Sequence, residues 1–336
     1  MNASSLPTVM RAQVLSAFGR PLQLSDLPVP SPGPGEVLVR VSAAGLNPLD
    51  VKIAAGEAAH AQVRTPAVLG LDAAGVVVAT GPGALGFAVG DEVYGMIGGV
   101  GGVQGSLAEY AAVDAALLAR KPAEWSMQEA AAVPLAVITA WEGLVDRAGV
   151  GVDDTVLVHG GAGGVGHLAV QLAAARGARV WATGREGQAE TLRRLGAVPI
   201  DFERSSVEDY VHEHTGGSGF GVVFDTVGGE NLDRSFLAVK RYTGRVVSSL
   251  GWGTHSLAPL SFRGASYSGV FTLLPLLTGE GRASHGRILA AAAELGTEGG
   301  LSPIVHSDEH CLDGADRALA EVARGVPAGK VVVRVA

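Results

Sequence analysis

The sequence predicts a two-domain α/β protein in which a β-rich domain accompanies a doubly wound parallel sheet. From Thr155 onward, apolar runs of strand length alternate with helical patterns, which is the order of a parallel sheet with helical crossovers. The first third instead carries short alternating runs separated by Pro and Gly, a pattern typical of antiparallel strands. With 336 residues, 47% of them hydrophobic and 17% charged, the chain is long enough for two buried cores.

The β-rich part is predicted from runs in which apolar and polar side chains alternate. These runs are 9–15, 36–41, 73–80, 91–96 and 108–113. An Ala-rich stretch over 127–148 then favours helix. We expect the first domain to end near this change of composition.

The parallel sheet is predicted from the alternation that follows. Strands are expected at 155–159, 179–183, 199–201, 222–225 and 245–249, and helices at 164–176, 187–195, 206–214 and 229–239. The tail departs from this order, with a helix over 282–295, a strand over 303–306, a helix over 312–324 and a strand over 330–335. We expect this tail to rejoin the first domain.

A glycine-rich turn after the first parallel strand is the strongest functional signal. Its glycines fit G-x-G-x-x-G between an apolar strand and a helix, which is the context of a dinucleotide pyrophosphate site. The phosphates would lie at the helix N-terminus, where free N–H groups and the helix dipole favour negative charge. The predicted cofactor contacts of this turn are Gly161, Ala162, Gly163, Gly164, Val165 and Gly166.

The end of the next strand distinguishes NADP(H) from NAD(H). An NAD site usually has Asp or Glu there, whereas this chain has Gly184 followed by Arg185. A guanidinium group binds a phosphate through paired N–H bonds, so the pattern predicts NADP(H). Glu186 opposes this interpretation, because a small change of register would place a carboxylate near the ribose.

Charge and composition exclude several other classes of function. The formal net charge is -8, which gives no basic field for nucleic acid. No apolar run is long enough to cross a membrane, and residues 1–9 lack the features of a secretory signal. We therefore expect a cytoplasmic protein. The single cysteine, Cys311, excludes a disulfide within the chain.

Five motifs in order make the chain resemble the zinc-independent branch of the medium-chain dehydrogenase/reductase superfamily, the quinone oxidoreductase and zeta-crystallin-like proteins. They lie at 45–50, 90–95, 139–142, 159–166 and 225–229. The resemblance implies a GroES-like catalytic domain formed by residues 1–127 and 281–336, with a Rossmann NADP-binding domain over 128–280. It also implies a homodimer that pairs sheet edges through 267–270.

The resemblance implies further site residues. The catalytic candidates are Asn47, which would face the nicotinamide ribose or the substrate, and Lys52, a possible proton donor with solvent as the alternative. The additional cofactor contacts would be Thr139, Phe202, Val227, Gly228, Leu250 and Gly251. Zinc-dependent relatives need several Cys and His ligands, and this chain has Gly70-Leu71-Asp72 in place of Gly-His-Glu. No metal is therefore expected.

These features predict an NADPH-dependent reductase of quinones or α,β-unsaturated carbonyls. One alternative is an enoyl-thioester reductase, disfavoured because Ala58 stands where those enzymes place a tyrosine. Another is a non-catalytic NADPH-binding crystallin-like protein. His60, His255 and His285 are expected in solvated loops, and the segment from Gly325 to Lys330 is interpreted as an imperfect match to a nucleotide-triphosphate loop.

Overall fold

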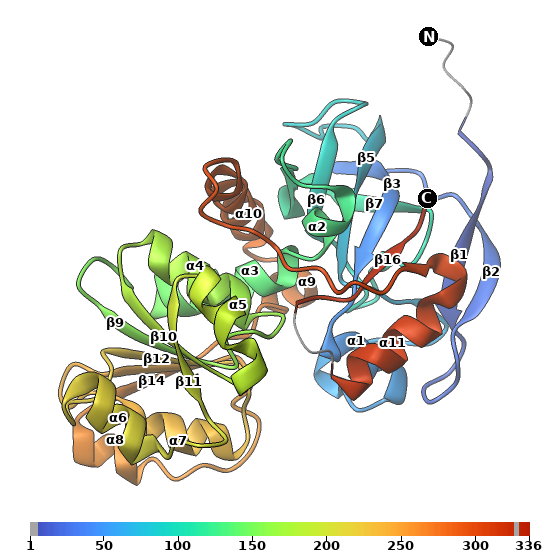
Figure 1. Ribbon diagram of the computed structural model, residues 1–336. Helices are drawn as coiled ribbons and strands as arrows, with labels where there is room; N and C mark the ends of the chain where they lie inside the picture. Colours follow the sequence, from blue (N-terminus) through green and yellow to red (C-terminus); the bar gives the residue numbers. More distant parts are fainter. Residues whose placement is uncertain (1–5, 326–328) are drawn as a thin grey trace.

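The computed structural model describes residues 6–325 and 329–336 and contains two lobes (Figure 1). One lobe is rich in β-strands and includes the first and last strands of the chain. The other is a layered α/β lobe drawn in green to orange. The mixed α/β class predicted from the sequence, a β-rich GroES-like domain beside a Rossmann-like parallel sheet, is confirmed.

The β-rich lobe is built on a seven-stranded sheet that joins distant parts of the chain. Its strand order is β15-β16-β3-β5-β6-β8, with β7 also paired to β3, and a smaller sheet has the order β2-β1-β4. Because β16 pairs antiparallel with β3, the C-terminal tail returns to the first domain as expected. The strands are β1 (Val9–Leu15), β2 (Gln23–Pro28), β3 (Glu36–Gly45), β4 (Ala67–Val68), β5 (Asp72–Thr80), β6 (Glu92–Met96), β7 (Tyr110–Asp114), β8 (Leu118–Arg120), β15 (His310–Cys311) and β16 (Val332–Arg334).

The α/β lobe contains a parallel sheet of six strands in the order β11-β10-β9-β12-β13-β14. The strands are β9 (Thr155–His159), β10 (Arg179–Gly184), β11 (Ala197–Asp201), β12 (Val222–Asp225), β13 (Arg245–Ser248) and β14 (Ser266–Gly269). The chain winds outward from β9 to β11 and then returns to add β12, β13 and β14 on the other side. The direction of winding therefore changes between β9 and β12, the place where open α/β sheets bind ligands.

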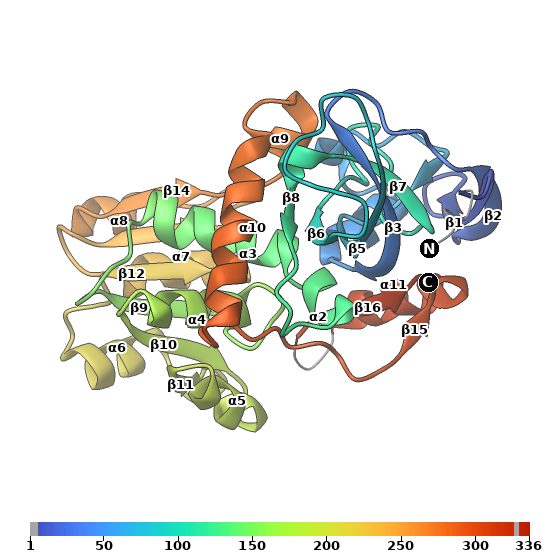
Figure 2. The ribbon, with the colours of Figure 1, turned by 90° about the horizontal axis from the view of Figure 1, so that it is seen from above.

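Helices cover both faces of the parallel sheet (Figure 2). They are α4 (Gly166–Ala175), α5 (Ala189–Arg194), α6 (Val207–Thr215), α7 (Glu230–Ala238) and α8 (Ala258–Arg263). Local signals fix their ends: Ser206 begins α6 by accepting a 3.2 Å bond from the Asp209 amide, and Gly177 follows α4 with a φ of +84°. These are ordinary capping solutions for the unpaired groups of helix ends.

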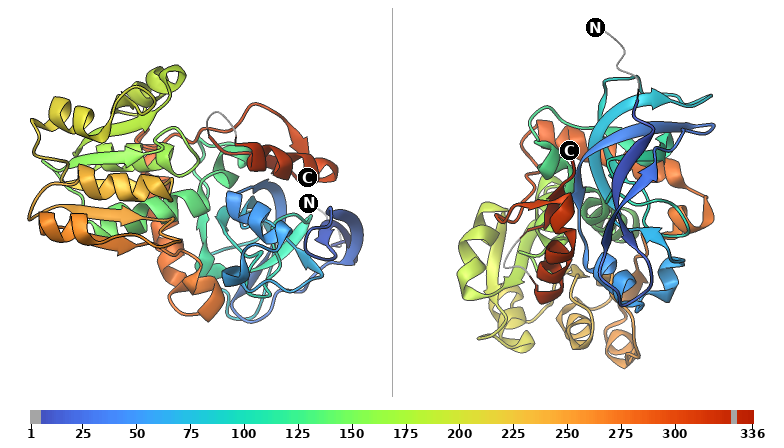
Figure 3. Two further views of the ribbon diagram at one scale, coloured as in Figure 1. Left: turned by 90° about the horizontal axis from the view of Figure 1, so that it is seen from below. Right: turned by 90° about the vertical axis from the view of Figure 1, so that its right-hand side faces the viewer.

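The junction between the lobes is formed by helices, some of which pack on the β-rich sheet and some on the parallel sheet. These are α2 (Met127–Ala131), α3 (Pro134–Trp141), a π-helical turn (Glu142–Arg147), α9 (Leu274–Thr278) and α10 (Arg282–Thr297). Helix α3 contacts α4, α10 and β6, so it touches both lobes. The two remaining helices, α1 (Pro48–Ala55) and α11 (Ala315–Arg324), lie side by side in the β-rich lobe. The first and last strands of the chain, β1 and β16, both lie in that lobe (Figure 3).

The structure corrects parts of the sequence prediction. The stretch 303–306 is no strand and makes only an isolated bridge between Val305 and Lys330. Helix α1 was missed because it has eight residues and a weak amphipathic pattern. Of the three histidines expected in solvated loops, His285 is instead fully buried on α10. Residues 326–328, inside the segment compared with a nucleotide-triphosphate loop, lie outside the described part of the chain.

Candidate active site

A cleft of about 730 Å³ lies where the two lobes meet, beside the change of winding in the parallel sheet. Most of the predicted site residues line it: Asn47, Lys52, Thr139, Ala162, Gly163, Gly164, Val165, Gly184, Arg185, Phe202, Val227 and Leu250. The other predicted residues, Gly161, Gly166, Gly228 and Gly251, are not among the residues that line it. Its volume falls within the range of ligand pockets.

The glycine-rich turn takes its shape from close backbone approaches. A Cβ on Gly161 would come within 2.5 Å of the Ala182 Cβ, and a Cβ on Gly166 would clash with the Gly160 carbonyl. Gly163 and Gly164 instead face the cleft. The glycine-rich segment leads directly into the N-terminal end of α4. The first N–H groups of a helix have no partner within the helix. This arrangement suits a pyrophosphate.

A buried histidine that the sequence analysis missed supports this turn. His167 Nδ1 lies 2.9 Å from the Gly163 carbonyl, and its Nε2 accepts a 3.2 Å bond from the Ile304 amide. Because the Ile304 amide can only donate, the Nδ1 atom carries the proton and donates to Gly163. Burial lowers the pKa of His167 to about 4, so the ring is neutral near pH 7. The histidine thereby ties the turn to the C-terminal segment.

The end of the cleft at β10 and β11 presents an arginine over an aromatic ring. The Arg185 guanidinium lies 6.0 Å from the centre of the Phe202 ring and makes a 3.1 Å ion pair with Glu203. Glu186 does not line the cleft and makes a 2.8 Å pair with Arg204. The carboxylate that opposed the NADP(H) interpretation is therefore held by a second arginine.

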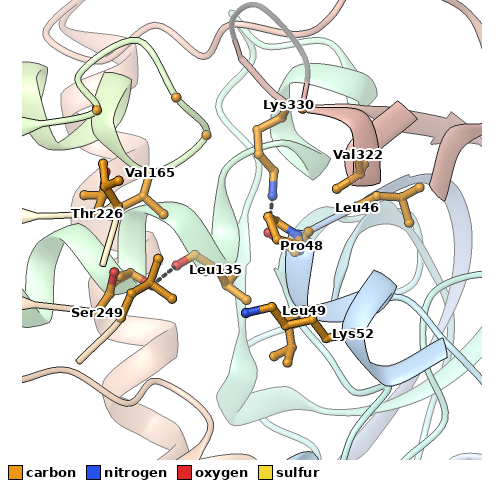
Figure 4. Close-up of a pocket in the computed structure, with 18 of the residues that line it drawn as sticks. Leu46, Pro48, Leu49, Lys52, Leu135, Val165, Thr226, Ser249, Val322 and Lys330 are labelled. Atoms are coloured by element: carbon orange, nitrogen blue, oxygen red, sulfur yellow. Dashed lines mark hydrogen bonds between the residues drawn. The ribbon is translucent and has the colours of Figure 1, made fainter. Parts of the chain in front are cut away.

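The middle of the cleft is shaped by loops that a buried carboxylate holds. Asp225 accepts bonds from the Gly228 amide at 3.1 Å and from the Ser248 hydroxyl at 2.8 Å. Ser248 in turn accepts from the Leu250 amide at 3.0 Å. The Thr139 hydroxyl faces the same region but donates to the Leu135 carbonyl of its own helix at 2.7 Å, and Thr226, Ser249 and Val165 lie nearby (Figure 4).

A buried polar cluster, formed by Asn47, Asp50, Asp72 and Lys330, lies beside the cleft. The Lys330 ammonium donates to Asn47 Oδ1 and lies 3.6 Å from Asp72 Oδ2, while the Asn47 amide donates to Asp72 Oδ2 at 3.0 Å. Asp50 accepts bonds from the Asn47 and Gly70 amides. All four residues are at most 4% exposed. In Figure 4, Lys330 reaches toward Pro48 at the start of α1.

Burial governs the protonation of this cluster. It raises the pKa of Asp50 to about 7 and raises the pKa of Asp72 as well. It also lowers the pKa of Lys330, because desolvation disfavours every charged form. The attraction between Lys330 and the two carboxylates opposes all three shifts. The ammonium therefore depends on these carboxylates for its charge.

The two lysines of the cleft differ in environment. Lys52, the proton donor candidate from the sequence, is exposed on α1 and lines the cleft. Lys330 is buried, and its side chain also meets the glycine-rich turn, because a Cβ on Gly164 would lie 3.1 Å from Lys330 Cδ. In the sequence, Lys330 stood out only as the end of the segment from Gly325 to Lys330, which we had compared with a nucleotide-triphosphate loop.

The donors at the cleft do not fit a catalytic zinc ion. Such a site needs three protein ligands, and the described residues that line the cleft include His60 and Glu57 but no cysteine. Cys311 lies in β15. Asp72 is already held by the Leu135 amide, Asn47 and Lys330. The ammonium group of Lys330 thus compensates the negative charge of Asp72, the carboxylate of the Gly-Leu-Asp motif.

The fold and the cleft together define an oxidoreductase of the class that binds a nicotinamide dinucleotide. Family models agree: residues 33–123 match the alcohol dehydrogenase GroES-like domain, and residues 164–275 match the domain described as zinc-binding dehydrogenase. The chain belongs to the medium-chain dehydrogenase/reductase superfamily, as its five motifs predicted. No helix among the described residues is long and apolar enough to span a membrane.

Individual relatives place the chain within this superfamily. A crystal structure of an alcohol dehydrogenase superfamily protein from Novosphingobium aromaticivorans is 53% identical, with a TM-score of 0.95 over 97% of this chain and 100% of that one. A 2-methylene-furan-3-one reductase of Solanum lycopersicum is 42% identical over 67% of this chain and 58% of its own length. An NADPH-dependent alkenal/one oxidoreductase of Arabidopsis thaliana, described as chloroplastic, is 38% identical over 77% and 66%.

Replacing Lys330 by Met should destabilise the protein strongly. The substitution removes the ammonium but leaves the buried Asp72 carboxylate, and breaking a buried pair in this way costs about 3 to 5 kcal/mol. The double variant Lys330→Met with Asp72→Asn should recover part of this loss, because the unpaired charge is gone. The free energy of unfolding in urea measures both effects. Lys52→Met is the control, and an equal loss for both lysines would contradict the prediction.

Proposed function

We propose that the protein is a zinc-independent, NADPH-dependent reductase of α,β-unsaturated carbonyls and quinones. The observation that carries the proposal is one cleft that joins a phosphate-binding turn to an apolar acceptor end without a zinc ligand set. Reduction of an electrophilic enone or quinone needs no metal, whereas oxidation of a simple alcohol is favoured by a Lewis acid that stabilises the alkoxide. The names of the tomato and Arabidopsis relatives support this substrate class.

The residues of this chain would act mainly by positioning. When bound, NADPH would supply a hydride for the β-carbon of the enone, and a proton from the cleft or from solvent would complete the reduction. The glycine-rich turn and Arg185 would hold the phosphates, and Thr139, Val227 and Leu250 would border the nicotinamide. Asn47 would face its ribose, held in place by Lys330. Holding the reacting carbons in contact supplies much of such a rate enhancement.

The source of the proton follows from exposure. Lys52 is the cleft lysine that reaches solvent, and we propose it as the donor, with protonation by water as the alternative. Lys330 is instead a positioning residue, because its ammonium is already engaged by Asn47 and Asp72.

We also propose the domain boundaries and the assembly. Residues 1–127 and 281–336 would form the catalytic domain, and residues 128–280 the NADP-binding domain. The expected homodimer would pair the edges of two Rossmann sheets. Strand β14 supports this arrangement, since it ends the sheet order and three of its four residues are exposed. We also propose a cytoplasmic location, as expected from the sequence.

The purified protein should oxidise NADPH in the presence of methyl vinyl ketone or para-benzoquinone. It should not reduce NADP⁺ with ethanol, and incubation with a metal chelator should leave the rates unchanged, because no step relies on a metal. Absorbance of the reduced nicotinamide measures all three. Turnover of a crotonyl thioester alone would favour the enoyl-thioester reductase. Tight NADPH binding without turnover of any acceptor would favour a crystallin-like binding protein.

Substituting Arg185 by Ala should weaken the preference for NADPH over NADH. The guanidinium would lose its bond to the ribose phosphate, which at this exposed position should raise the KM for NADPH about fivefold to tenfold and leave the KM for NADH unchanged. Arg194→Ala is the matched control, because Arg194 is exposed at the end of α5 and does not line the cleft. An unchanged ratio of the two KM values would refute the cofactor assignment.

Gly269→Lys should convert the homodimer to a monomer. The Ser266 amide of β14 donates to the Gly244 carbonyl just before β13, and the Val270 amide donates to the Ser248 carbonyl. The alternate amides, those of Tyr267 and Gly269, therefore face the open edge. A lysine there would place two like charges across the dimer axis, and its Cβ would make only an ordinary 3.8 Å contact with Tyr267 Oη. Light scattering gives the mass. A wild-type protein that is already monomeric would disprove the edge pairing.

A further inference from the structure

Three rings from three separate segments meet on one wall of the cleft, and we call His60, Trp252 and Phe271 the aromatic wall. The His60 and Trp252 rings are stacked with centres 5.0 Å apart and an angle of 22° between their planes. Phe271 meets both edge-on, at 5.9 Å from His60 and 5.8 Å from Trp252. All three residues line the same cleft as Asn47 and Gly164. The sequence analysis expected His60 in a solvated loop. In the structure its ring instead packs against two other rings.

The topology of the sheet places this wall at the acceptor end of the cleft. Arg185 and Phe202 follow β10 and β11 on one side of the glycine-rich turn, where the adenosine phosphate would lie. Trp252 and Phe271 follow β13 and β14 on the opposite side, and the sheet order puts β9 with its turn between the two. A dinucleotide that extends across the turn would therefore bring its nicotinamide toward the wall and leave the wall for the acceptor.

The wall is open to a ligand. Trp252 is 54% exposed although it borders a cleft, and the lining of that cleft also includes Leu49 and Leu273. An exposed indole beside apolar side chains gains most from a flat, uncharged ring, through area burial and through offset or edge-to-face ring contacts. A short aliphatic enone offers neither.

We propose that the aromatic wall selects acceptors that carry a flat conjugated ring, such as aryl vinyl ketones and quinones, over aliphatic enones of the same size. This inference rests on the proposed reductase function and adds the substrate class. Trp252 is the main specificity residue, because it is exposed whereas His60 and Phe271 are half-buried. His60 orients it by stacking on one face.

The test compares phenyl vinyl ketone with cyclohexyl vinyl ketone, which differ in the flatness of the ring. The ratio of their kcat/KM values in Trp252→Leu, divided by the wild-type ratio, cancels the intrinsic reactivity of each ketone. Loss of the ring contact should lower the preference for the phenyl ketone about threefold to tenfold. Trp252→Phe should retain most of it. Phe262→Leu, at an 85% exposed position on α8, should change nothing.

A second measurement separates this inference from the reductase proposal. Calorimetric titration of the protein loaded with NADP⁺ should give tighter binding of propiophenone, which cannot be reduced at a double bond, than of cyclohexyl ethyl ketone. The difference should shrink in Trp252→Leu, while the dissociation constant of NADPH stays the same. If aliphatic enones are reduced but neither readout favours the aryl ketone, the wall does not select the acceptor. Weaker NADPH binding in Trp252→Leu with an unchanged aryl preference would assign the wall to the cofactor instead.

Discussion

The buried ammonium of Lys330, held between Asn47 and Asp72, is the interaction on which the arrangement of the cleft depends. Asn47 begins α1, Asp72 begins β5, and Lys330 lies just before β16, so one charge joins three segments that are far apart in the sequence. The Lys330 stem also lies against the glycine-rich turn of the other lobe. A buried ion pair is costly to desolvate and contributes little net stability. Its contribution here is to fix the position of Asn47 relative to the turn.

Around this cluster, the cleft divides into two ends of opposite character. At the β10 and β11 end, Arg185 and Phe202 offer a cation and a ring to a nucleotide. At the β13 and β14 end, the aromatic wall and leucines offer apolar surface to an acceptor. The neutral His167 and the Asp225 hydrogen bonds hold the backbone between them without placing free charge in the cleft. Under the proposed function, polar groups would orient the ligands while the acceptor end stays apolar, which suits hydride transfer in a water-poor site.

Local pattern was enough to predict most elements of the α/β lobe. Strands β9 and β12 were predicted at their observed bounds, and β10 within one residue, because buried parallel strands are short apolar runs between glycines. The cofactor turn was equally visible, since only glycine permits its approaches to Ala182 and the Gly160 carbonyl. By contrast, the strand expected over 303–306 failed. The Ile304 amide donates to the His167 ring instead of to a neighbouring strand, and the segment pairs only through an isolated bridge between Val305 and Lys330.

The sequence by itself determined the fold class, the superfamily and the location of the glycine-rich turn, because each depends on residues that are neighbours in the chain. Only the tertiary structure decided which lysine is buried, which carboxylate it faces, and that His60, Trp252 and Phe271 share one wall. Those outcomes depend on contacts between segments up to 283 residues apart. No local periodicity records such contacts, because they form only when the C-terminal strand returns to the first sheet and encloses the cleft.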